Sequence, residues 1–323
     1  MAGPLVGTTH DRSRRAARHR KQVLTRLAKR GLLTTRHYHR ALSRTTLPGV
    51  AVLCYHGIRD DRMPAGTIPF QYLHLPRATF EAHCRLIREC CDPISLDDWR
   101  AAENGGPPLP KRPVLMTFDD GYRSVLTMAA PILSAYEIPA AVFVCTGPMV
   151  SRRLLWFDDV AAREGEGAVE SWKSVDYRAW ATGCAEVSGM VGDEPRALMT
   201  PAELGALARM DGIEIGGHTA RHPILARASA CEQSEEIRQN LSAIHAWTGS
   251  TARSFAYPNG RPGIDYTAET SAIVRDAGVD IAFTTRPAFA VPSDPPLERS
   301  RFVILDDIND AELAHRLAYS WPR

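Results

Sequence analysis

Apolar residues along this 323-residue chain fall into short runs of strand length. Most of these runs are separated by segments with a helical repeat or by long crossings, a pattern typical of parallel α/β sheets. The runs occupy residues 50–55, 114–118, 140–144, 213–215, 254–257, 279–284 and 301–305. The pattern therefore predicts a seven-stranded α/β fold, which we expect to close into a barrel.

The segments between the runs predict the helices. Apolar positions recur at helical spacing over 77–91, 124–136, 201–210, 231–247, 267–277 and 310–319. Thr200 is placed to cap the helix that starts at residue 201. Residues 148–200 show a less regular pattern, and a long irregular segment in a compact domain tends to be functional. We expect this segment to form part of a cleft wall.

Charge separates the amino terminus from the remainder. Residues 1–44 hold twelve Lys or Arg and one Asp, whereas the remaining residues hold 27 basic and 36 acidic side chains. We therefore divide the chain into a basic extension, 1–47, loosely ordered or helical, and a catalytic domain, 48–323. Such an extension suits contact with an anionic membrane or a solubilising role, and nucleic acid is not expected because no base-reading motif accompanies it.

The cysteines and the apolar runs restrict the cellular compartment in which we expect the protein. The seven cysteines form an odd set without a CxxC pair, which argues against a disulfide framework and against a cysteine zinc site. No apolar run approaches the roughly 20 residues that span a bilayer, and the amino terminus lacks the apolar core of a secretory signal. These features predict a cytoplasmic protein, which could be peripheral at the inner membrane face.

Two adjacent carboxylates follow the run 114–118. Asp119 and Asp120 precede Gly121, so an apolar strand delivers two acids and then a residue that permits a sharp turn. Adjacent carboxylates repel, and they are tolerated best where a cation lies between them or one holds a proton. An ordinary acidic turn would show the same letters, because Asp-Asp-Gly is also common turn chemistry.

Two histidines follow another strand. His218 and His222 lie four residues apart after the pair Gly216-Gly217, which lets the backbone approach the site closely. On a helical turn this spacing places both rings on one face. Together with one carboxylate they would make a three-ligand set of the kind that leaves a position open in catalytic zinc sites, and the second carboxylate would then be free to act as a base.

Three motifs in this order resemble those of a known family. Thr117–Gly121 (TFDDG), His218–His222 (HTARH) and Phe255–Gly260 (FAYPNG) are similar to the motifs of the polysaccharide deacetylases, the NodB-homology proteins of carbohydrate esterase family 4. The similarity extends from about Tyr55 to Leu305. The resemblance implies a distorted (β/α) barrel of seven strands and a metal-dependent hydrolase that removes N-acetyl groups from an N-acetylhexosamine glycan or glycoconjugate.

The resemblance also implies roles for individual residues. Asp119 would be the general base, and Asp120, His218 and His222 would hold a divalent metal, Zn²⁺ in preference to Co²⁺ or Ni²⁺. The backbone N–H of Asn259, in the third motif, would donate to the developing oxyanion.

The sequence departs from the family pattern at two places. Many members carry an arginine in the third motif that orients the base, but Ala256 stands there, so Arg123 and Arg301 become the candidates for this role. Many members also carry a late Leu-x-His motif whose histidine is the general acid, whereas the late strand here continues as Ile304-Leu305-Asp306-Asp307 without a histidine. Tyr55-His56 resembles a subgroup acting on exopolysaccharide poly-N-acetylglucosamine, and on that basis His56 is predicted to be the general acid.

Two aromatic residues and several alternatives complete the prediction. Trp156 and Tyr257 are candidates for substrate contact, with ordinary core packing as the competing interpretation for both. The rival to a hydrolase is a non-catalytic carbohydrate-binding relative of the same fold. A phosphotransferase lacks its DxDxT spacing, and a non-haem iron oxygenase lacks its HxD or HxE run. The glycan could be an exopolysaccharide, a lipid-linked sugar or an N-acetylated glycoside.

Overall fold

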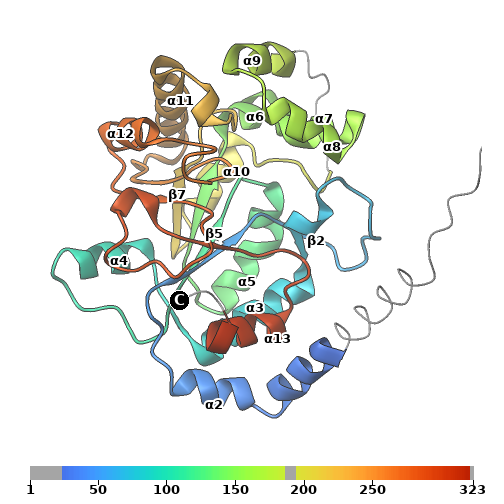
Figure 1. Ribbon diagram of the computed structural model, residues 1–323, viewed down its shortest axis with the longest axis vertical. Coiled ribbons are helices and arrows are strands. Elements are labelled where there is room, and N and C mark those ends of the chain that lie inside the picture. The colour runs from blue at the N-terminus through green and yellow to red at the C-terminus, as the bar shows by residue number, and fades with distance from the viewer. Residues whose placement is uncertain (1–23, 186–193, 321–323) are drawn as a thin grey trace, which may run out of the picture.

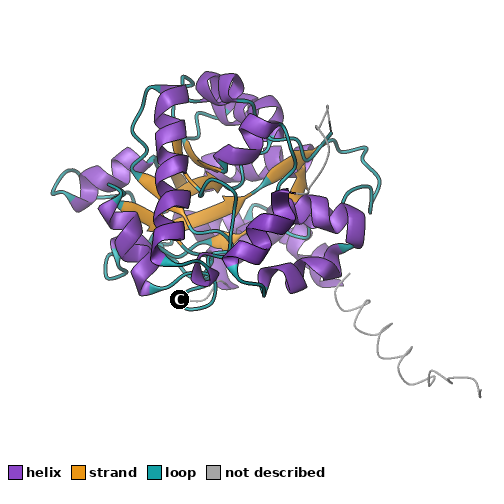
Figure 2. Cartoon of the chain, turned by 90° about the horizontal axis from the view of Figure 1, so that it is seen from above, coloured by secondary structure: helices purple, strands orange, loops and turns teal. Residues whose placement is uncertain are grey.

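A parallel sheet lies at the centre of the computed structural model, which describes residues 24–185 and 194–320. Helices surround the strands in both views (Figures 1 and 2). The strand order is β10-β1-β5-β6-β7-β8-β9, and β4 pairs with β5 beside this path. The strands are β1 Ala51–Tyr55, β4 Asp92–Pro93, β5 Pro113–Phe118, β6 Ala140–Val144, β7 Ile213–Gly217, β8 Ser254–Ala256, β9 Ile281–Phe283 and β10 Phe302–Val303.

The seven predicted strands make up the main path of the sheet, whereas its closure is incomplete. Every residue of β1 and β5 is buried, as expected for strands covered on both faces. The end strands β9 and β10 do not pair with each other along their length. A single parallel bridge, Phe283 with Arg299, links the strand β9 to the segment before β10. The fold is therefore a distorted, partly open barrel.

Helices cover the sheet, and most lie where the sequence predicts them. They are α2 His37–Ser43, α3 Arg77–Cys90, α4 Leu96–Glu103, α5 Ala130–Ala135, α6 Thr146–Ser151, α7 Trp156–Glu164, α8 Glu166–Lys173, α9 Tyr177–Ala185, α10 Pro201–Leu207, α11 Ala230–Thr248, α12 Ala268–Asp276 and α13 Asp310–His315. The predicted cap of α10 is confirmed: the Thr200 hydroxyl accepts from the Glu203 N–H, and the Glu203 carboxylate accepts from the Thr200 N–H. Helix α4 was not predicted.

The predicted helix 124–136 starts as a π-helical turn, Val125–Ala129, and continues as α5. Pro131, at the start of α5, has no N–H to donate to the preceding turn, which favours a change of helical geometry there. A short pair of parallel strands, β2 Gly57–Arg59 and β3 His74–Pro76, lies outside the main sheet.

The prediction of an irregular segment at 148–200 was wrong, because most of its described residues form helices α6 to α9. These helices are six to nine residues long, too short to show a clear repeat in the sequence. They pack through an aromatic cluster instead, in which Trp156 contacts Trp172 and Trp180. The helices gather beside one end of the sheet (Figure 1).

The described part of the basic extension contacts the body of the protein. Residues 24–34 are helical, and α2 follows them below α3 and α13 in Figure 1. Tyr38 on α2 is fully buried, and its hydroxyl lies 3.1 Å from Nδ1 of His315. Residues 37–47 therefore pack on the predicted catalytic domain, while residues 1–23 of the predicted extension lie outside the described residues.

Between residues 24 and 185 and between 194 and 320, no helix has the length and apolar character that crossing a membrane requires.

Candidate active site

Asp119 and Asp120 lie at the carboxyl end of β5, where the chain makes a sharp turn. The Asp119 N–H still donates to the carbonyl of Tyr55 on the neighbouring strand, at 2.9 Å. The next two residues are left-handed, with φ of 73° at Asp120 and 88° at Gly121. This conformation is unusual for a residue with a side chain, and it persists where the surrounding structure holds it. The turn sends the two carboxylates to different partners.

Asp120 meets the two histidines of the second motif. Its Oδ1 lies 3.5 Å from Nε2 of His218 and 3.6 Å from Nε2 of His222, and all three side chains are buried. The other carboxylate oxygen, Oδ2, is buried with no hydrogen-bond partner among the described residues. Two imidazole nitrogens and a carboxylate that converge in this way, with a buried oxygen left over, fit a divalent metal.

The loop that carries the histidines is not the predicted helical turn. Thr219 and His222 are both left-handed, with φ of 66° and 62°. The Thr219 hydroxyl holds this conformation by accepting from the His222 N–H at 2.9 Å. Nδ1 of His218 lies 2.6 Å from the carbonyl oxygen of Ala256, which leaves its Nε2 for the cluster. The rings meet because the loop is irregular.

The two glycines before His218 are required by close packing. A Cβ atom on Gly216 would lie 2.5 Å from the ring of Phe143, and one on Gly217 would lie 2.7 Å from Oδ1 of Asn240. Neither distance is possible for a real side chain, so the predicted close approach of the backbone is confirmed.

Helix α11 supports the histidine loop through two buried polar residues that the sequence analysis missed. The Glu236 carboxylate accepts from the backbone N–H and from Nε of Arg221, at 2.9 and 2.8 Å. Oδ1 of Asn240 accepts from the His218 N–H at 3.1 Å, and its amide donates to the carbonyl of Val144 at 2.8 Å. The available signal was their spacing: two polar residues four apart, interleaved with the apolar positions of a predicted helix.

Arg301 holds the proposed base. Its guanidinium is fully buried and donates to both oxygens of Asp119, at 2.7 Å each, a bidentate pair. Arg123, the other candidate for this role, pairs with Glu203 at 2.7 Å. Arg301 therefore does what the missing third-motif arginine would do, although it lies 182 positions from Asp119 in the sequence.

Electrostatics keep the proposed base charged. Burial alone would raise the pKa of Asp119, but the nearby positive charge of Arg301 outweighs it and lowers that pKa well below its ordinary value. Burial and the neighbouring His218 lower the pKa of His222 to about 3, so its ring is neutral, as a metal ligand must be.

A cavity of about 330 Å³ opens onto these groups. It brings together six of the predicted site residues: His56, Asp119, Asp120, His218, His222 and Asn259. Its remaining wall includes Phe70, Tyr72, Leu73, Phe157, Val169, Lys173, Arg261, Thr285 and Val303. Three of these, Phe157, Val169 and Lys173, come from α7 and α8, so the segment predicted as a cleft wall does line the cavity despite its helical structure.

His56 and Asn259 keep polar groups available in this cavity. Nδ1 of His56 is buried without a hydrogen-bond partner in the described ranges. Asn259 is left-handed, with φ of 56°, and its carbonyl oxygen accepts from the Thr285 hydroxyl at 2.6 Å. That contact fixes the peptide unit of the third motif at the edge of the cavity.

Neither of the two predicted substrate-contacting aromatics lines this cavity, so their contact with substrate stays a prediction. Trp156 is buried, and its Nε1 donates to the carbonyl of His222 at 2.8 Å. Tyr257 is fully buried, its ring stacks on Tyr266 at 3.8 Å between centroids, and its hydroxyl donates to the carbonyl of Leu297. Both rings turn inward because packing and a hydrogen bond are available there.

The sequence of this chain matches a known protein family and is similar to a protein of known activity. The polysaccharide deacetylase family matches residues 106–282, more than half of the chain. Poly-β-1,6-N-acetyl-D-glucosamine N-deacetylase of Escherichia coli K12 is 50% identical over 93 residues, which are 28% of this chain and only 13% of that relative.

Solved structures share the fold. A deacetylase from Streptococcus pyogenes, PplD in complex with acetate, is 20% identical with a TM-score of 0.61, over 84% of this chain and 99% of its own. IcaB from Ammonifex degensii is 23% identical with the same TM-score, over 84% and 97%. The motifs, the sheet and the family match agree: this chain belongs to the polysaccharide deacetylase family.

Proposed function

We propose that this protein removes N-acetyl groups from a glycan built of N-acetylhexosamine units, in a metal-dependent hydrolysis. The observation that carries the proposal is the meeting, at one cavity, of a carboxylate held by Arg301 with the cluster of Asp120, His218 and His222. Family membership supports the reaction class, and the 93-residue similarity to a poly-N-acetylglucosamine deacetylase supports that polymer as the substrate.

Asp120, His218 and His222 would hold the metal. When bound, a divalent ion supplies a Lewis acid that polarises the acetamide carbonyl and makes water more acidic. Zn²⁺ is the proposed ion because two histidines and one carboxylate are a frequent ligand set in zinc hydrolases. Co²⁺ and Ni²⁺ accept similar ligands.

The remaining residues would move protons and stabilise charge. Asp119, kept ionised by Arg301, takes a proton from the attacking water. The backbone N–H of Asn259 donates to the carbonyl oxygen as negative charge develops on it. His56, in the same cavity, gives a proton to the leaving nitrogen as the C–N bond breaks. The products are acetate and a free amine.

Acetate release from β-1,6-linked N-acetylglucosamine oligomers tests the proposal directly. We expect Zn²⁺-loaded protein to release acetate, and Asp119→Asn to lower the rate by about 100- to 10,000-fold, the usual range for a general base. His56→Ala should reduce the rate with the metal still bound. Binding of the oligomers without any acetate release would favour the non-catalytic carbohydrate-binding alternative.

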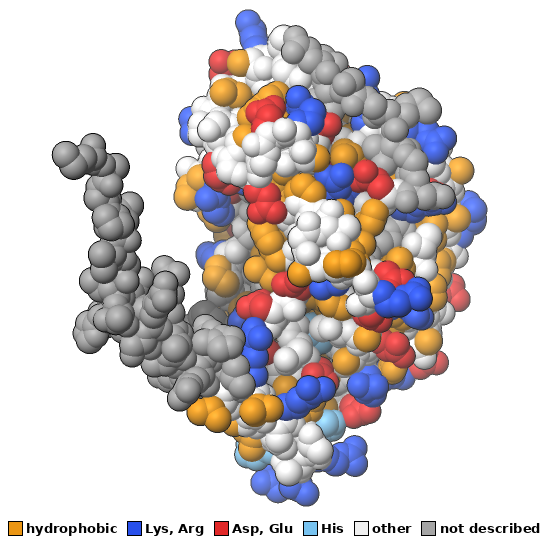
Figure 3. Space-filling model, turned by 90° about the vertical axis from the view of Figure 1, so that its right-hand side faces the viewer, with side chains coloured by type: hydrophobic (Ala, Val, Ile, Leu, Met, Phe, Trp, Pro, Cys, Tyr) orange, Lys and Arg blue, Asp and Glu red, His pale blue; other side chains and the backbone are white. Residues whose placement is uncertain are grey.

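We also propose that the start of the described chain contacts an anionic membrane surface, which would place the protein at the inner face of a membrane. The helix over residues 24–34 exposes Leu24 and Leu27, at 66% and 60%, beside the basic Arg26 and Arg30. Figure 3 shows apolar and basic side chains together on the surface at its lower left, whereas both charge signs are interspersed over the rest of that face.

Co-sedimentation with vesicles tests this membrane contact. The full chain should bind vesicles rich in phosphatidylglycerol and leave neutral phosphatidylcholine vesicles unbound. The double variant Leu24→Ser/Leu27→Ser should bind less, while Val150→Ser, an exposed apolar residue elsewhere, serves as the matched control. Equal binding to both vesicle types would contradict the proposal.

A further inference from the structure

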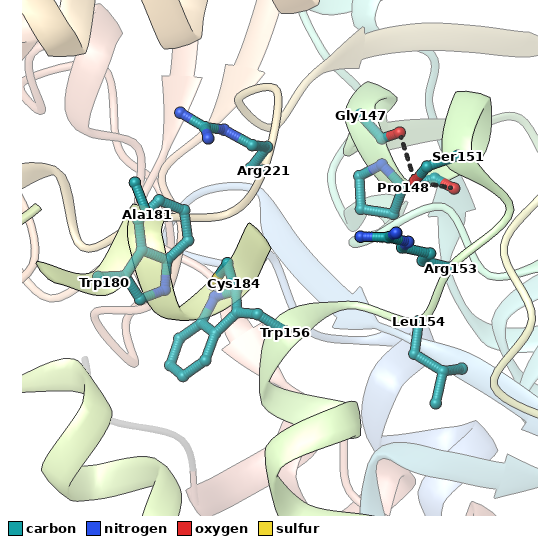
Figure 4. A pocket seen from close by; sticks show the side chains of 10 residues that line it. All are labelled: Gly147, Pro148, Ser151, Arg153, Leu154, Trp156, Trp180, Ala181, Cys184 and Arg221. Atoms are coloured by element: carbon teal, nitrogen blue, oxygen red, sulfur yellow. Dashed lines mark hydrogen bonds between the residues drawn. The ribbon is translucent and has the colours of Figure 1, made fainter. Parts of the chain in front are cut away.

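A second cavity, of about 290 Å³, lies on the other side of the histidine loop from the first. Figure 4 shows α6 and the turn after it on one side, Trp156 and α9 on the other, and Arg221 of the histidine loop above them. The residues that line it are Gly147, Pro148, Ser151, Arg153, Leu154, Trp156, Trp180, Ala181, Cys184 and Arg221. The proposed chemistry does not use this cavity, although Arg221 of the second motif lines it.

The cavity wall combines apolar side chains with a buried donor. Pro148, Leu154 and Ala181 offer apolar contact. Trp180 is only 4% exposed, and its indole N–H has no acceptor among residues 24–185 and 194–320. A buried tryptophan N–H ordinarily has an acceptor, so we expect this N–H to donate to an oxygen atom of a ligand or of water.

The charged side chains that line the cavity are all basic. Arg221 is neutralised by the buried Glu236, whereas no carboxylate in the described ranges pairs with Arg153. No Asp or Glu lines the cavity. Its wall therefore offers hydrogen-bond donors and a positive charge, which attract an oxygen-bearing group and repel an ammonium group.

The histidine loop is a wall shared by both cavities. His222 lines the first cavity, while its neighbour Arg221 lines the second. Trp156 lines the second cavity and donates to the carbonyl of His222. The Gly147 N–H, at the opposite wall, donates to the carbonyl of Ala220 at 2.7 Å. A chain-like ligand that leaves the first cavity across this loop would reach the second.

We propose that the second cavity binds the N-acetyl group of another sugar unit in the same glycan, an inference that rests on the proposed function. The sugar unit lies between the two walls: its acetyl methyl group packs against Ala181 and its acetyl carbonyl oxygen accepts from Trp180. On the opposite wall, Arg153 donates to another oxygen atom of the same unit. A unit that has already lost its acetyl group carries an ammonium, which Arg153 disfavours. The cavity thus selects glycans whose neighbouring units are still acetylated.

Oligomer binding tests this assignment in full-length, Zn²⁺-loaded Asp119→Asn protein, which prevents turnover during the measurement. Calorimetric titration with β-1,6-linked N-acetylglucosamine oligomers, from dimer to hexamer, should show affinity rising about tenfold once the oligomer spans both cavities. Arg153→Gln should remove most of that gain and leave dimer binding unchanged. Trp180→Phe, which keeps the ring and removes the N–H, should remove part of it.

The adjacent Arg152 provides the matched control. It is exposed and does not line the cavity, so Arg152→Gln should retain the full length dependence. Affinity that is equal for the dimer and the hexamer, or a gain that survives Arg153→Gln, would overturn the inference. Acetate in the low millimolar range that displaces the hexamer but not the dimer would assign the second cavity to free acetate and overturn it as well.

The charge preference has its own readout. A hexamer with one free amine should bind several-fold more weakly than the fully acetylated hexamer, and Arg153→Glu should reverse this order at low ionic strength. An unchanged order in Arg153→Glu would contradict the selection for acetylated neighbours. Acetate release by the wild-type protein tests the proposed function separately, because it does not depend on Arg153: if release occurs without length dependence, only this inference fails.

Discussion

The chain contains the same three letters, Phe-Asp-Asp, at two places, and their first aspartates have opposite properties. Phe118-Asp119-Asp120 ends a strand, and Phe157-Asp158-Asp159 begins helix α7. Asp119 and Asp158 are both buried. The pKa of Asp119 lies well below its ordinary value, whereas burial raises the pKa of Asp158 to about 7.

The difference lies in the partner of each carboxylate. Burial raises both pKa values, but Asp119 receives two charge-assisted hydrogen bonds from Arg301. Asp158 receives one hydrogen bond from the Tyr122 hydroxyl, at 2.7 Å to Oδ2, and its Oδ1 has no partner among the described residues. A buried carboxylate is therefore a base or a neutral acid according to whether a cation reaches it.

Removal of Arg301 should have the largest effect, because it leaves Asp119, like Asp158, buried without a cation at its carboxylate. We expect Arg301→Met to lower acetate release by about 1,000-fold or more, comparable to loss of the base, and to destabilise the fold by about 3–5 kcal/mol, as when one partner of a buried ion pair is removed. Acetate assays and urea unfolding measure the two effects. Arg301→Lys keeps the charge without the bidentate geometry and should lie between; a fully active Arg301→Met would refute the role of Arg301.

Asp158→Asn should change how stability depends on pH. The folded-state pKa of about 7 is above the ordinary value of 3.8, so between these values the folded protein binds a proton that the unfolded chain lacks, and wild-type stability falls as pH rises through that window. Asp158→Asn has no carboxyl group at this position, so its stability does not fall for this reason as pH rises. Its stability relative to wild type should therefore increase by up to about 4 kcal/mol from pH 4 to pH 8.

Urea unfolding across that pH range checks this prediction. Asp159→Asn is the matched control, because Asp159 pairs with the half-exposed Arg163 and should show no comparable change. A constant difference between wild type and Asp158→Asn at every pH would mean that Asp158 is charged in the folded protein.

Glu236 is a third buried carboxylate, and it sharpens the comparison because it accepts two hydrogen bonds from Arg221 of the histidine loop, besides one from the Tyr177 hydroxyl. Glu236→Gln keeps the shape and loses the charge that holds Arg221. We expect metal affinity to fall about 10- to 100-fold, as for other groups that orient metal ligands. Co²⁺ titration followed by visible absorption measures this without turnover. Glu235→Gln, on the same helix but paired with Arg238, should leave the affinity unchanged.

Tyr122→Phe should give the smallest effect. It removes the hydrogen bond that the Tyr122 hydroxyl donates to the Asp158 carboxyl group, which costs about 1 kcal/mol of stability at pH 6. In the Asp158→Asn background the cost should change, since the two residues share that bond. A double-mutant cycle by urea unfolding measures the coupling, and additive effects would show that the hydroxyl contributes nothing through Asp158.

The strands and the site motifs were predictable because their signals are local. Buried strands read as continuous apolar runs, and the carboxyl ends of parallel strands meet at one edge, so the amino-acid sequence alone is enough to group Asp119, Asp120, His218 and His222. The helices α6 to α9 were not predicted, since short helices that pack through an aromatic cluster leave no regular repeat.

What the sequence determined by itself is therefore the order of the seven main strands and of the longer helices along the chain, the family and the residues of the proposed chemistry. The tertiary structure alone decided which of two arginines holds Asp119, that the histidine loop is irregular and supported by α11, that Trp156 and Tyr257 pack inward, and that one Phe-Asp-Asp holds a charge while the other does not. The reason is physical: a backbone pattern depends on neighbours in the chain, whereas the charge state of a buried group depends on whichever side chain the fold brings within hydrogen-bond distance.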